Sequence, residues 1–296
     1  MAKKIIAYLG PEGASFGYQA AVKYLAITSK QREYAAVSYK SHEGICEAVA
    51  LGNVSLGVVA IENTVAGFVE ETLASLAHWQ TLESIKAIQE VSLVVDIRAY
   101  SKDGKMPADL KRIFSHGVGI TQCSRYVELM RSKYPEMVAE AVASTGDAAK
   151  RASEVAGSIA LTGSVAAKKY NLFAAEPDLK TDSNSHTRFF IVSKSSDKID
   201  PEKVDFAEYK TMMCFEMTLA QSGCLQKTLS FFSSQDINMR VVHEIRTPNR
   251  LWEYRFLVEF ECHVHQDSFR RALGNFNKSG ISMAPPIIYG SYLKGI

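Results

Sequence analysis

The sequence predicts an α/β protein that ends in a smaller module with its own order of elements. In roughly the first two thirds of the chain, β-branched strand-like runs alternate with helical patterns, as in proteins built on largely parallel sheets. After a polar, proline-bearing stretch at 193–203, the predicted order becomes strand, helix, strand, strand, helix, strand. This βαββαβ order over about 85 residues is ferredoxin-like.

Short hydrophobic runs predict the strands of the first part. They lie at 4–9, 34–40, 55–61, 89–97, 113–114, 138–143, 157–162 and 188–193. Apolar residues at helical spacing separate them, at 16–27, 42–52, 68–79, 119–134, 146–156 and 164–171. Because most strands are followed by a helix, we expect crossover connections and parallel neighbours.

The second part is predicted to hold strands and helices in the ferredoxin-like order. These are strand 211–219, helix 223–232, strands 239–247 and 252–261, helix 268–277 and strand 286–291. A chain of 296 residues agrees with about two domains of about 150 residues each. We therefore expect one domain over 1–196 and another over 207–292.

Charge and hydropathy exclude two classes of function. The net charge is +2, and no Lys/Arg cluster carries interleaved aromatic residues, so a dedicated nucleic-acid-binding role is not expected. The most hydrophobic stretch, 91–97, is interrupted by Asp96 and is far shorter than a membrane span. The apolar run before Gly10 is too short for the core of a signal peptide. We expect a soluble cytoplasmic protein with no membrane or nucleic-acid partner.

The five cysteines, Cys46, Cys123, Cys214, Cys224 and Cys262, are odd in number and scattered. None belongs to a C-x-x-C pair or to a Cys/His set with the spacing of metal ligands. We interpret them as reduced, mostly buried thiols, and we expect no metal site.

A sharp change from apolar to polar residues marks a candidate site near residue 60. The run 56–61 reads as a strand buried on both faces, and it ends in Glu62, Asn63 and Thr64. Ligands of open parallel sheets bind beyond the carboxyl ends of the strands. These three residues are therefore expected at a ligand site.

The same kind of junction recurs along the first part. Ser115 and Gln122 follow the strand at 113–114, Ser144 and Thr145 have the composition of a helix N-cap, and Thr187 lies at the start of a later strand. All offer small hydrogen-bonding groups at strand ends or helix starts, where backbone amides also receive anions. Together they predict a site for a small, carboxylate-rich molecule.

At these positions the chain resembles the prephenate dehydratase family, and the resemblance covers nearly the whole length. The segments that carry it are Tyr8-Leu9-Gly10-Pro11-Glu12-Gly13, Ala60-Ile61-Glu62-Asn63-Thr64-Val65-Ala66-Gly67, Ser115-His116 with Gln122-Cys123, Ser144-Thr145, and Thr187-Arg188-Phe189. Each segment alone is a weak signal. Five of them in the family's order, at plausible spacing, are a strong one.

The resemblance implies a two-lobed, periplasmic-binding-protein-like (type II) catalytic domain with the substrate in the cleft between the lobes. It also implies that the ferredoxin-like part is an ACT regulatory domain. The family's reaction expels carbon dioxide and hydroxide from prephenate in one 1,4-elimination, driven by aromatisation. No metal or organic cofactor is implied.

The resemblance also implies roles for particular residues. The expected catalytic residues are Thr187, Asn63, Glu62, Gln122 and Ser115. The expected substrate-binding residues are Thr64, Ser144, Thr145, Arg188 and Ser15. Thr187 is expected to donate to the departing hydroxyl, and Glu62 to fix the site through Asn63 or loop amides. Because successive strand residues point to opposite faces, Arg188 is also open to a structural ion-pair role.

For the regulatory part, the resemblance implies that L-phenylalanine binds between two subunits. The expected contacts are Gly223, Cys224 and Leu225 of one subunit, and Asn238 and Glu244 of its neighbour. A lone four-stranded sheet leaves open edges and a half-covered face. We therefore expect edge-to-edge pairing in a homodimer or homotetramer.

Some segments depart from the family pattern. The opening loop looks one residue longer and has Gly17 in place of a hydroxyl, and Gly117-Val118 replace Pro-Gln after His116, which we expect to be structural. The segment 243–248 also looks one residue longer, which leaves weakened inhibition open. Two alternative functions stay open. One is arogenate dehydratase, which performs the same elimination on an amino acid, and the other is a non-catalytic sensing protein with the same fold.

Overall fold

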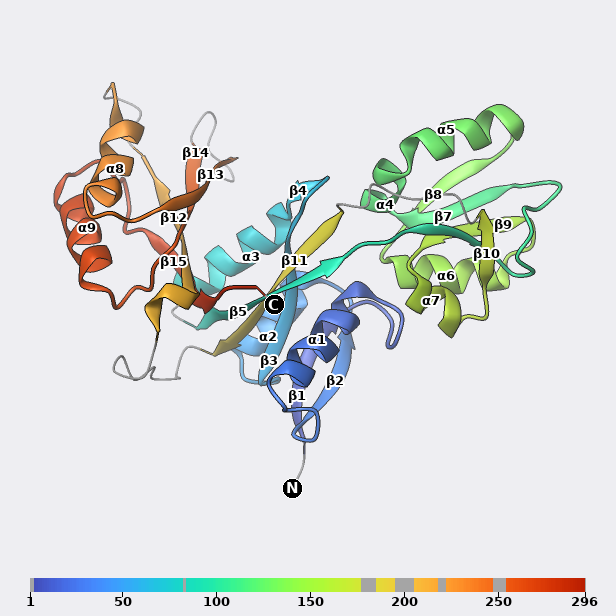
Figure 1. Ribbon diagram of the computed structural model, residues 1–296, viewed down its shortest axis with the longest axis horizontal. Coiled ribbons are helices and arrows are strands. Elements are labelled where there is room, and N and C mark those ends of the chain that lie inside the picture. The colour runs from blue at the N-terminus through green and yellow to red at the C-terminus, as the bar shows by residue number, and fades with distance from the viewer. Residues whose placement is uncertain are drawn as a thin grey trace.

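The computed structural model describes residues 3–81, 84–176, 185–194, 205–217, 222–246 and 254–295. Their strands form two sheets (Figure 1). The larger sheet has ten strands, with β4 paired to β3 and the other nine in the order β13-β14-β12-β15-β5-β11-β3-β1-β2. The smaller has five in the order β10-β6-β9-β7-β8.

The first lobe lies in the middle of Figure 1 and is built on part of the larger sheet. Its elements are β1 (Lys4–Leu9), α1 (Phe16–Ile27), β2 (Tyr34–Tyr39), α2 (His42–Ala50), β3 (Leu56–Asn63), β4 (Gly67–Phe68), α3 (Glu70–Thr81), β5 (Ile85–Val94) and β11 (His186–Lys194). Strand β11 returns from the second lobe and pairs between β3 and β5.

The second lobe holds the smaller sheet. Its elements are β6 (Arg98–Ser101), β7 (Arg112–His116), α4 (Gly117–Gln122), α5 (Ser124–Lys133), β8 (Val138–Val142), α6 (Thr145–Glu154), β9 (Ser158–Thr162), α7 (Ser164–Lys169) and β10 (Phe173–Glu176). A single insertion between β5 and β11 thus forms a complete second α/β lobe (Figure 1). The predicted two-lobed architecture is confirmed.

The predicted parallel arrangement is only partly right. Strand β1 is parallel to β2 and β3, and β7 is parallel to β8 and β9. Strand β11 is antiparallel to both β3 and β5. The reason is its entry: β11 starts at the cleft, where β3 ends, because the chain is coming back from the second lobe. This arrangement brings the end of β3 and the start of β11 together.

The last part of the chain has the ferredoxin-like order that the sequence predicts. Its elements are η2 (Phe206–Glu208), β12 (Tyr209–Glu216), α8 (Cys224–Ser233), β13 (Met239–Arg246), β14 (Tyr254–Phe260), α9 (Asp267–Lys278) and β15 (Ile287–Leu293). The four strands are antiparallel, in the order β13-β14-β12-β15. Buried phenylalanines of α8, α9 and the sheet form one core, around Phe232, Phe260, Phe269 and Phe276. We call 205–295 the C-terminal module.

The C-terminal module is joined to the first lobe more closely than the sequence suggests. Strand β15 pairs with β5 through Leu293 and Gln89, which closes one edge of the module's sheet. Helix α3 covers the face that α8 and α9 leave open, and the Tyr289 hydroxyl donates to the Leu73 carbonyl oxygen at 3.2 Å. Only the β13 edge of this sheet remains unpaired among the described strands.

Several local details differ from the sequence expectations. The predicted helix 119–134 is two helices, because Cys123 has φ −101° and ψ 21° between α4 and α5. The short strands β4, β6 and β10 were not predicted. All five cysteines are buried free thiols, as expected. No helix in the described part of the chain is long and apolar enough to cross a membrane.

Candidate active site

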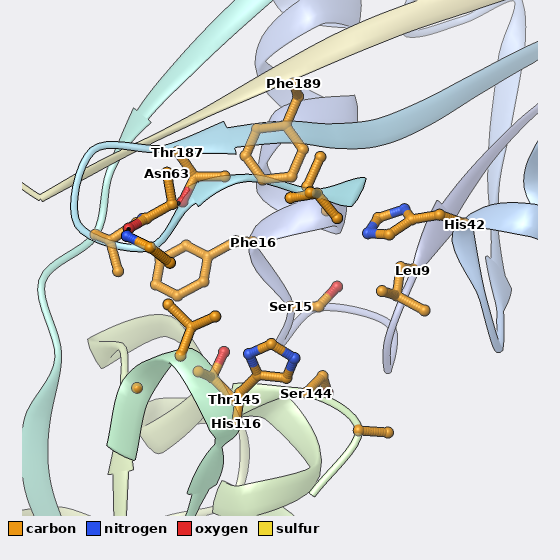
Figure 2. A pocket seen from close by; sticks show the side chains of 18 of the residues that line it. Leu9, Ser15, Phe16, His42, Asn63, His116, Ser144, Thr145, Thr187 and Phe189 are labelled. Atoms are coloured by element: carbon orange, nitrogen blue, oxygen red, sulfur yellow. Dashed lines mark hydrogen bonds between the residues drawn. The ribbon is translucent and has the colours of Figure 1, made fainter. Parts of the chain in front are cut away.

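A cavity of about 530 Å³ lies between the two lobes (Figure 2). The first lobe lines it with the ends of β1 and β3, the start of β11 and the starts of α1 and α2. The second lobe contributes α4, with His116 before it, and the start of α6. Six of the ten predicted catalytic and substrate-binding residues line the cavity: Ser15, Asn63, Gln122, Ser144, Thr145 and Thr187.

Asn63 is the centre of the hydrogen bonding in this cavity. Its Oδ1 accepts from the backbone amides of Val65 and Ala66, at 2.9 and 3.0 Å, and from Gln122 Nε2 at 3.0 Å. Its Nδ2 donates to Thr187 Oγ1 at 3.0 Å. Three donors on one atom and a hydroxyl acceptor on the other fix which end of the amide is oxygen. The side chain is therefore held in one orientation.

Thr187 lies directly opposite Asn63 in the β3–β11 pairing. Its Oγ1 accepts the Asn63 amide hydrogen, and no other hydrogen bond of this hydroxyl occurs among the described residues. A threonine hydroxyl has one hydrogen to donate and two lone pairs. Because the asparagine occupies a lone pair, the hydrogen is available to a molecule in the cavity. The geometry thus makes Thr187 a donor.

Gln122 connects the two lobes. From the end of α4 in the second lobe, its Nε2 donates to Asn63 Oδ1 and to Ser185 Oγ, each at 3.0 Å. Its Oε1 is buried and has no hydrogen-bond partner in the described part of the chain. Buried acceptors are rarely left unpaired in native proteins. A donor on a bound molecule would satisfy this one.

Three helices begin at the cavity wall, each with a serine as its N-cap. Ser15 caps α1, Ser41 caps α2 and Ser144 caps α6, and each accepts from a backbone amide of its first turn at 3.0–3.1 Å. Helix N-termini carry partial positive charge and attract anions. The cavity lining also includes Lys40, whose side chain is exposed. Among the described residues of the lining, Glu71 is the one acidic side chain. The cavity therefore favours an anionic ligand.

Glycines allow the two lobes to meet beside the cavity. A Cβ at Gly146, in the first turn of α6, would lie 2.6 Å from Pro11 Cγ across the cleft. A Cβ at Gly17 would lie 2.8 Å from the Leu9 carbonyl oxygen, so this position has no room for the hydroxyl residue of the family pattern. The opening glycine loop is therefore packed against α6.

Two histidines face the cavity from opposite lobes (Figure 2). Burial, with a smaller contribution from His116, lowers the pKa of His42 to about 4, and burial also lowers the pKa of His116. His42 is 8% exposed, and its Nδ1 has no hydrogen-bond partner among the described residues. Both rings are therefore neutral donor–acceptor groups near pH 7. His116, expected to be structural, lines the cavity.

Four predicted site residues lie outside the cavity lining. Ser115 is fully buried, and its hydroxyl donates to the Leu161 carbonyl oxygen at 2.8 Å. Thr64 is exposed, and its Oγ1 accepts from the His186 amide at 3.0 Å. Both side chains hold local backbone instead of facing the cavity. Glu62 and Arg188 are the other two.

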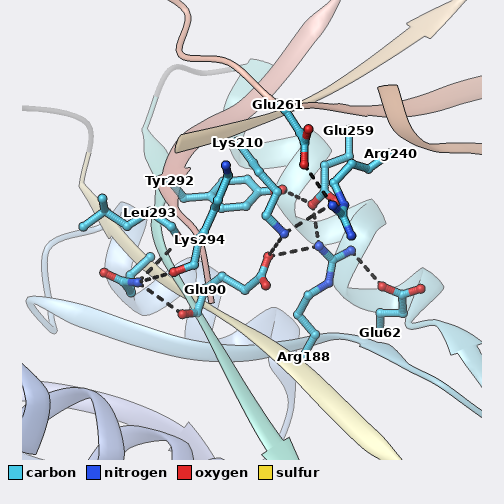
Figure 3. A network of polar contacts seen from close by, with 11 residues as sticks. Glu62, Glu90, Arg188, Lys210, Arg240, Glu259, Glu261, Tyr292, Leu293 and Lys294 are labelled. Atoms are coloured by element: carbon cyan, nitrogen blue, oxygen red, sulfur yellow. Dashed lines mark hydrogen bonds and ion pairs between the residues drawn. The ribbon is translucent and has the colours of Figure 1, made fainter. Parts of the chain in front are cut away.

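Arg188 and Glu62 follow and precede the cavity-lining residues Thr187 and Asn63 in their strands, so their side chains point to the opposite face of the sheet. There they belong to a network of ion pairs (Figure 3). Arg188 lies 2.7 Å from Glu62 and 3.1 Å from Glu90, and it also pairs with Glu259. Although burial opposes its charged form, the surrounding carboxylates raise the pKa of Arg188. Glu62 therefore pairs with Arg188, and not with Asn63 or loop amides as expected. Arg188 takes the ion-pair role and does not clamp a ligand in this cavity.

Sequence reasoning missed Ser41, His42 and the aromatic wall of the cavity. A signal existed for Ser41, which follows the predicted strand 34–40 and precedes a predicted helix, like Ser144. Phe189 lies two residues after Thr187 in β11 and lines the same cavity, as strand alternation requires. Nothing in the sequence alone distinguishes His42 from a core histidine.

Family comparison agrees with this geometry. The family model of prephenate dehydratase matches residues 6–197. The chain belongs to the prephenate dehydratase family. The matched segment includes all but the first two residues of β1 in the two lobes, and every residue of the Asn63, Gln122 and Thr187 cluster.

Curated relatives match over most of the chain. A bifunctional chorismate mutase/prephenate dehydratase from Pseudomonas aeruginosa is 27% identical over 98% of this chain and 73% of its own length. A prephenate dehydratase from Bacillus subtilis is 29% identical over 86% of this chain and 88% of its own. Both matches are longer than the two lobes alone.

Solved structures share the fold over nearly the whole chain. A prephenate dehydratase from Arthrobacter aurescens in complex with L-Phe has a TM-score of 0.78 at 23% identity, over 98% of this chain and 90% of that one. A protein described as a novel type of quorum quenching acylase has a TM-score of 0.74 at 22% identity, over 98% and 97%. At these identities the likeness shows the fold, and the function must be argued from the site.

Proposed function

We propose that this prephenate dehydratase family member converts prephenate to phenylpyruvate, carbon dioxide and water. The observation that carries the proposal is the Asn63–Thr187 hydrogen bond, which leaves the hydroxyl hydrogen of Thr187 available to a ligand in a cavity that favours anions. Loss of a hydroxyl from a dianion needs such a donor. Family membership supplies the substrate class.

The reaction needs one proton, which the solvent supplies, and no other reactant. The bond between the ring and its carboxylate breaks to give carbon dioxide, and that electron pair enters the ring. The bond to the ring hydroxyl breaks at the opposite end of the ring, and the hydroxide takes up a proton to leave as water. Aromatisation supplies the driving force. The protein must orient the substrate and stabilise the departing oxygen.

Thr187 performs the second task in this proposal. A threonine hydroxyl is too weak an acid for full proton transfer, so it acts through a hydrogen bond that strengthens as negative charge develops on the leaving oxygen. Donation from Asn63 Nδ2 to Thr187 Oγ1 polarises the threonine O–H further. Gln122 keeps the Asn63 amide in place. The three residues thus act as one donor array.

The helix starts perform the first task. The carboxylates of prephenate are placed near the N-termini of α1 and α6, at Ser15, Ser144 and Thr145, with the start of α2 nearby. This arrangement binds negative charge with dipoles instead of with buried cations. It also leaves the ring hydroxyl for the Asn63–Thr187 side of the cavity.

The same lining favours prephenate over arogenate. Arogenate carries an ammonium group where prephenate has a ketone, and an ammonium needs acceptors or a carboxylate around it. Helix N-termini repel it, and Glu71, the one acidic lining residue among those described, is exposed. Arogenate should therefore be a poor substrate.

The test is to supply prephenate and arogenate separately to the purified protein, without added metal or nucleotide. Phenylpyruvate is measured from the first and phenylalanine from the second. We expect rapid phenylpyruvate formation and little phenylalanine. A folded protein that converts neither would favour the non-catalytic sensing function, and faster conversion of arogenate would identify an arogenate dehydratase.

We also assign residues 1–196 to the catalytic domain and 207–292 to an ACT domain that binds L-phenylalanine. Gly223 is the αL N-cap of α8, Cys224 is buried, and Leu225 is half-buried behind it. Asn238 and Glu244 are both exposed. Asn238 directly precedes β13, and Glu244 lies within it. The last two residues of the segment 243–248, which departs from the family pattern, lie outside the described residues.

Assembly through β13 would complete that effector site. The β15 edge and the open face of the module are already covered, so β13 is the edge left for a second copy. The module then pairs into a homodimer, or a homotetramer of dimers. Five buried free thiols agree with a reducing compartment such as the cytoplasm.

A further inference from the structure

Next to the pair of Asn63 and Thr187, the pairing of β3 with β11 contains a second pair of facing residues. In the pairing of β3 with β11, Thr187 is opposite Asn63, and Arg188 is opposite Glu62. The register shifts immediately after Arg188, so a bulge begins at this point. Bulges re-aim neighbouring side chains and are common beside active sites. The orientation of Thr187 is therefore set at the same two positions that hold Arg188 and Glu62.

Arg188 forms ion pairs with carboxylates from two parts of the chain, the first lobe and the C-terminal module (Figure 3). Glu62 and Glu90 belong to strands β3 and β5 of the first lobe, and Glu259 belongs to strand β14 of the C-terminal module. The side chain of Arg188 is 12% exposed, and that of Glu259 is 2% exposed. Among the described residues, Glu259 is the one carboxylate of the module that reaches Arg188.

The module holds Glu259 firmly. The Tyr292 hydroxyl on β15 donates to Glu259 Oε1, and Lys210 on β12 lies 3.7 Å from Glu259 Oε2. Lys210 also pairs with Glu90 at 2.6 Å. Three strands of the module therefore converge on a carboxylate that contacts the residue next to Thr187. A shift of this sheet would move Glu259 with it.

A buried arginine cannot be left without its carboxylates, because an unpaired buried charge is strongly unfavourable. If Glu259 moves or loses its charge, Arg188 must shift toward Glu62 and Glu90. The backbone of Arg188 is continuous with that of Thr187, so such a shift alters the Thr187–Asn63 alignment. Catalysis is sensitive to misplacements of about 1 Å.

We propose that Glu259 is a positioning residue for the active site, supplied by the C-terminal module. It holds Arg188 so that Thr187 keeps its hydrogen bond to Asn63, and it does not touch the substrate. This inference rests on the proposed dehydratase activity for its kinetic consequence. It also gives the module a direct physical connection to the catalytic pair within one chain.

The kinetic test compares Glu259→Gln with Glu261→Gln. Glu261 follows Glu259 by two residues, and its side chain is 26% exposed. It forms an ion pair with Arg240 of the same module at 2.9 Å. We expect Glu259→Gln to lower kcat at least about tenfold while KM changes little, since positioning and not binding is lost. The Glu261→Gln control should keep kcat within about twofold.

A second measurement does not depend on turnover. The side-chain NH₂ resonances of Asn63 report its hydrogen bond to Thr187 directly, and they should shift or broaden in Glu259→Gln and stay unchanged in Glu261→Gln. If the wild-type protein fails to convert prephenate, the proposed function is lost, but these resonances still decide the positioning role.

A folded Glu259→Gln protein with wild-type kcat and unchanged Asn63 resonances would overturn the inference. Should Glu259→Gln not fold, Glu259→Asp replaces it, because this change keeps the charge and withdraws it by one methylene. Glu259→Asp should lower kcat in the same direction and shift the same resonances. Unaltered kcat and resonances in folded Glu259→Asp would then overturn the proposal equally.

Discussion

Asn63 and Thr187 form a directed pair, in which the asparagine amide donates and the threonine oxygen accepts at 3.0 Å. The direction matters more than the distance. If the hydrogen bond ran in the opposite direction, Thr187 would donate its only hydroxyl hydrogen to Asn63 and could not donate to a leaving hydroxyl. Three donors on Asn63 Oδ1 exclude that reverse arrangement.

Substitution of Thr187 tests this pair. We expect Thr187→Ala or Thr187→Val to lower kcat about a hundredfold or more, since one transition-state hydrogen bond is worth ~10²–10³ in rate. Thr187→Ser should keep much of the activity, because it retains the hydroxyl. Steady-state kinetics with prephenate should show a smaller change in KM than in kcat. Near-normal turnover in a folded Thr187→Val protein would remove this residue from the mechanism.

The buried His42 should make stability depend on pH. Its pKa is lowered from 6.5 to about 4 in the folded protein, so the unfolded chain binds the extra proton between these values. The contribution of His42 to the free energy of unfolding is therefore complete above about pH 6.5. It decreases as the pH drops toward 4, by up to about 1.4 kcal/mol per pH unit.

Urea unfolding of wild-type protein and His42→Asn between pH 4 and 7 measures this effect. The variant should lose less stability on acidification than the wild type does. His263, whose pKa burial also lowers to about 4, contributes equally to both proteins and cancels in the difference. Parallel curves for the two proteins would mean that His42 is not buried as a neutral ring.

The Arg188 network should stabilise the fold as well as the site. Arg188→Ala leaves the carboxylates of Glu90 and Glu259 buried with less compensation, and loss of one partner from such a pair costs about 3–5 kcal/mol. Arg112→Ala removes an exposed ion pair with Glu140 and should change the free energy of unfolding little. Equal effects of the two substitutions on urea unfolding would contradict the buried character of the network.

L-phenylalanine should bind the C-terminal module and inhibit. If its binding favours a less active arrangement of the cleft, linkage requires that prephenate and L-phenylalanine weaken each other's affinity by the same factor. Calorimetry with L-phenylalanine, alongside activity over the same concentrations, checks this. The departure from the family pattern at 243–248 makes the strength of inhibition the quantity to measure. No binding heat and no inhibition up to millimolar ligand would leave the module with a structural role only.

Local patterns predicted the parts of the site that local structure builds. Ser144 was found because an N-cap needs a small oxygen acceptor before a helix, and Asn63 because a buried strand ends there. Helix 16–27 was predicted with its observed bounds from the helical spacing of its apolar residues. These features depend on a few neighbouring residues, so one sequence is enough to indicate them.

Contacts between distant segments were not predictable in this way. Glu259 lies 71 residues from Arg188 in the chain, and Lys210 lies 120 residues from Glu90. Each is a charged residue in a strand, which sequence patterns place at the surface. Only the pairing of β15 with β5 buries them, and that pairing follows from how the module sits on the first lobe. The same limit applies to Ser115, whose partner Leu161 is in another strand.

The hydrogen bond from Gln122 to Asn63 crosses the cleft, and this has a consequence for the catalytic cycle. Any separation of the lobes would break this bond together with the one to Ser185. The open protein therefore has an Asn63 amide with one restraint fewer, and a threonine whose donor is less well aimed. The complete donor array of Asn63, Gln122 and Thr187 therefore exists only while the two lobes are in contact at Gln122.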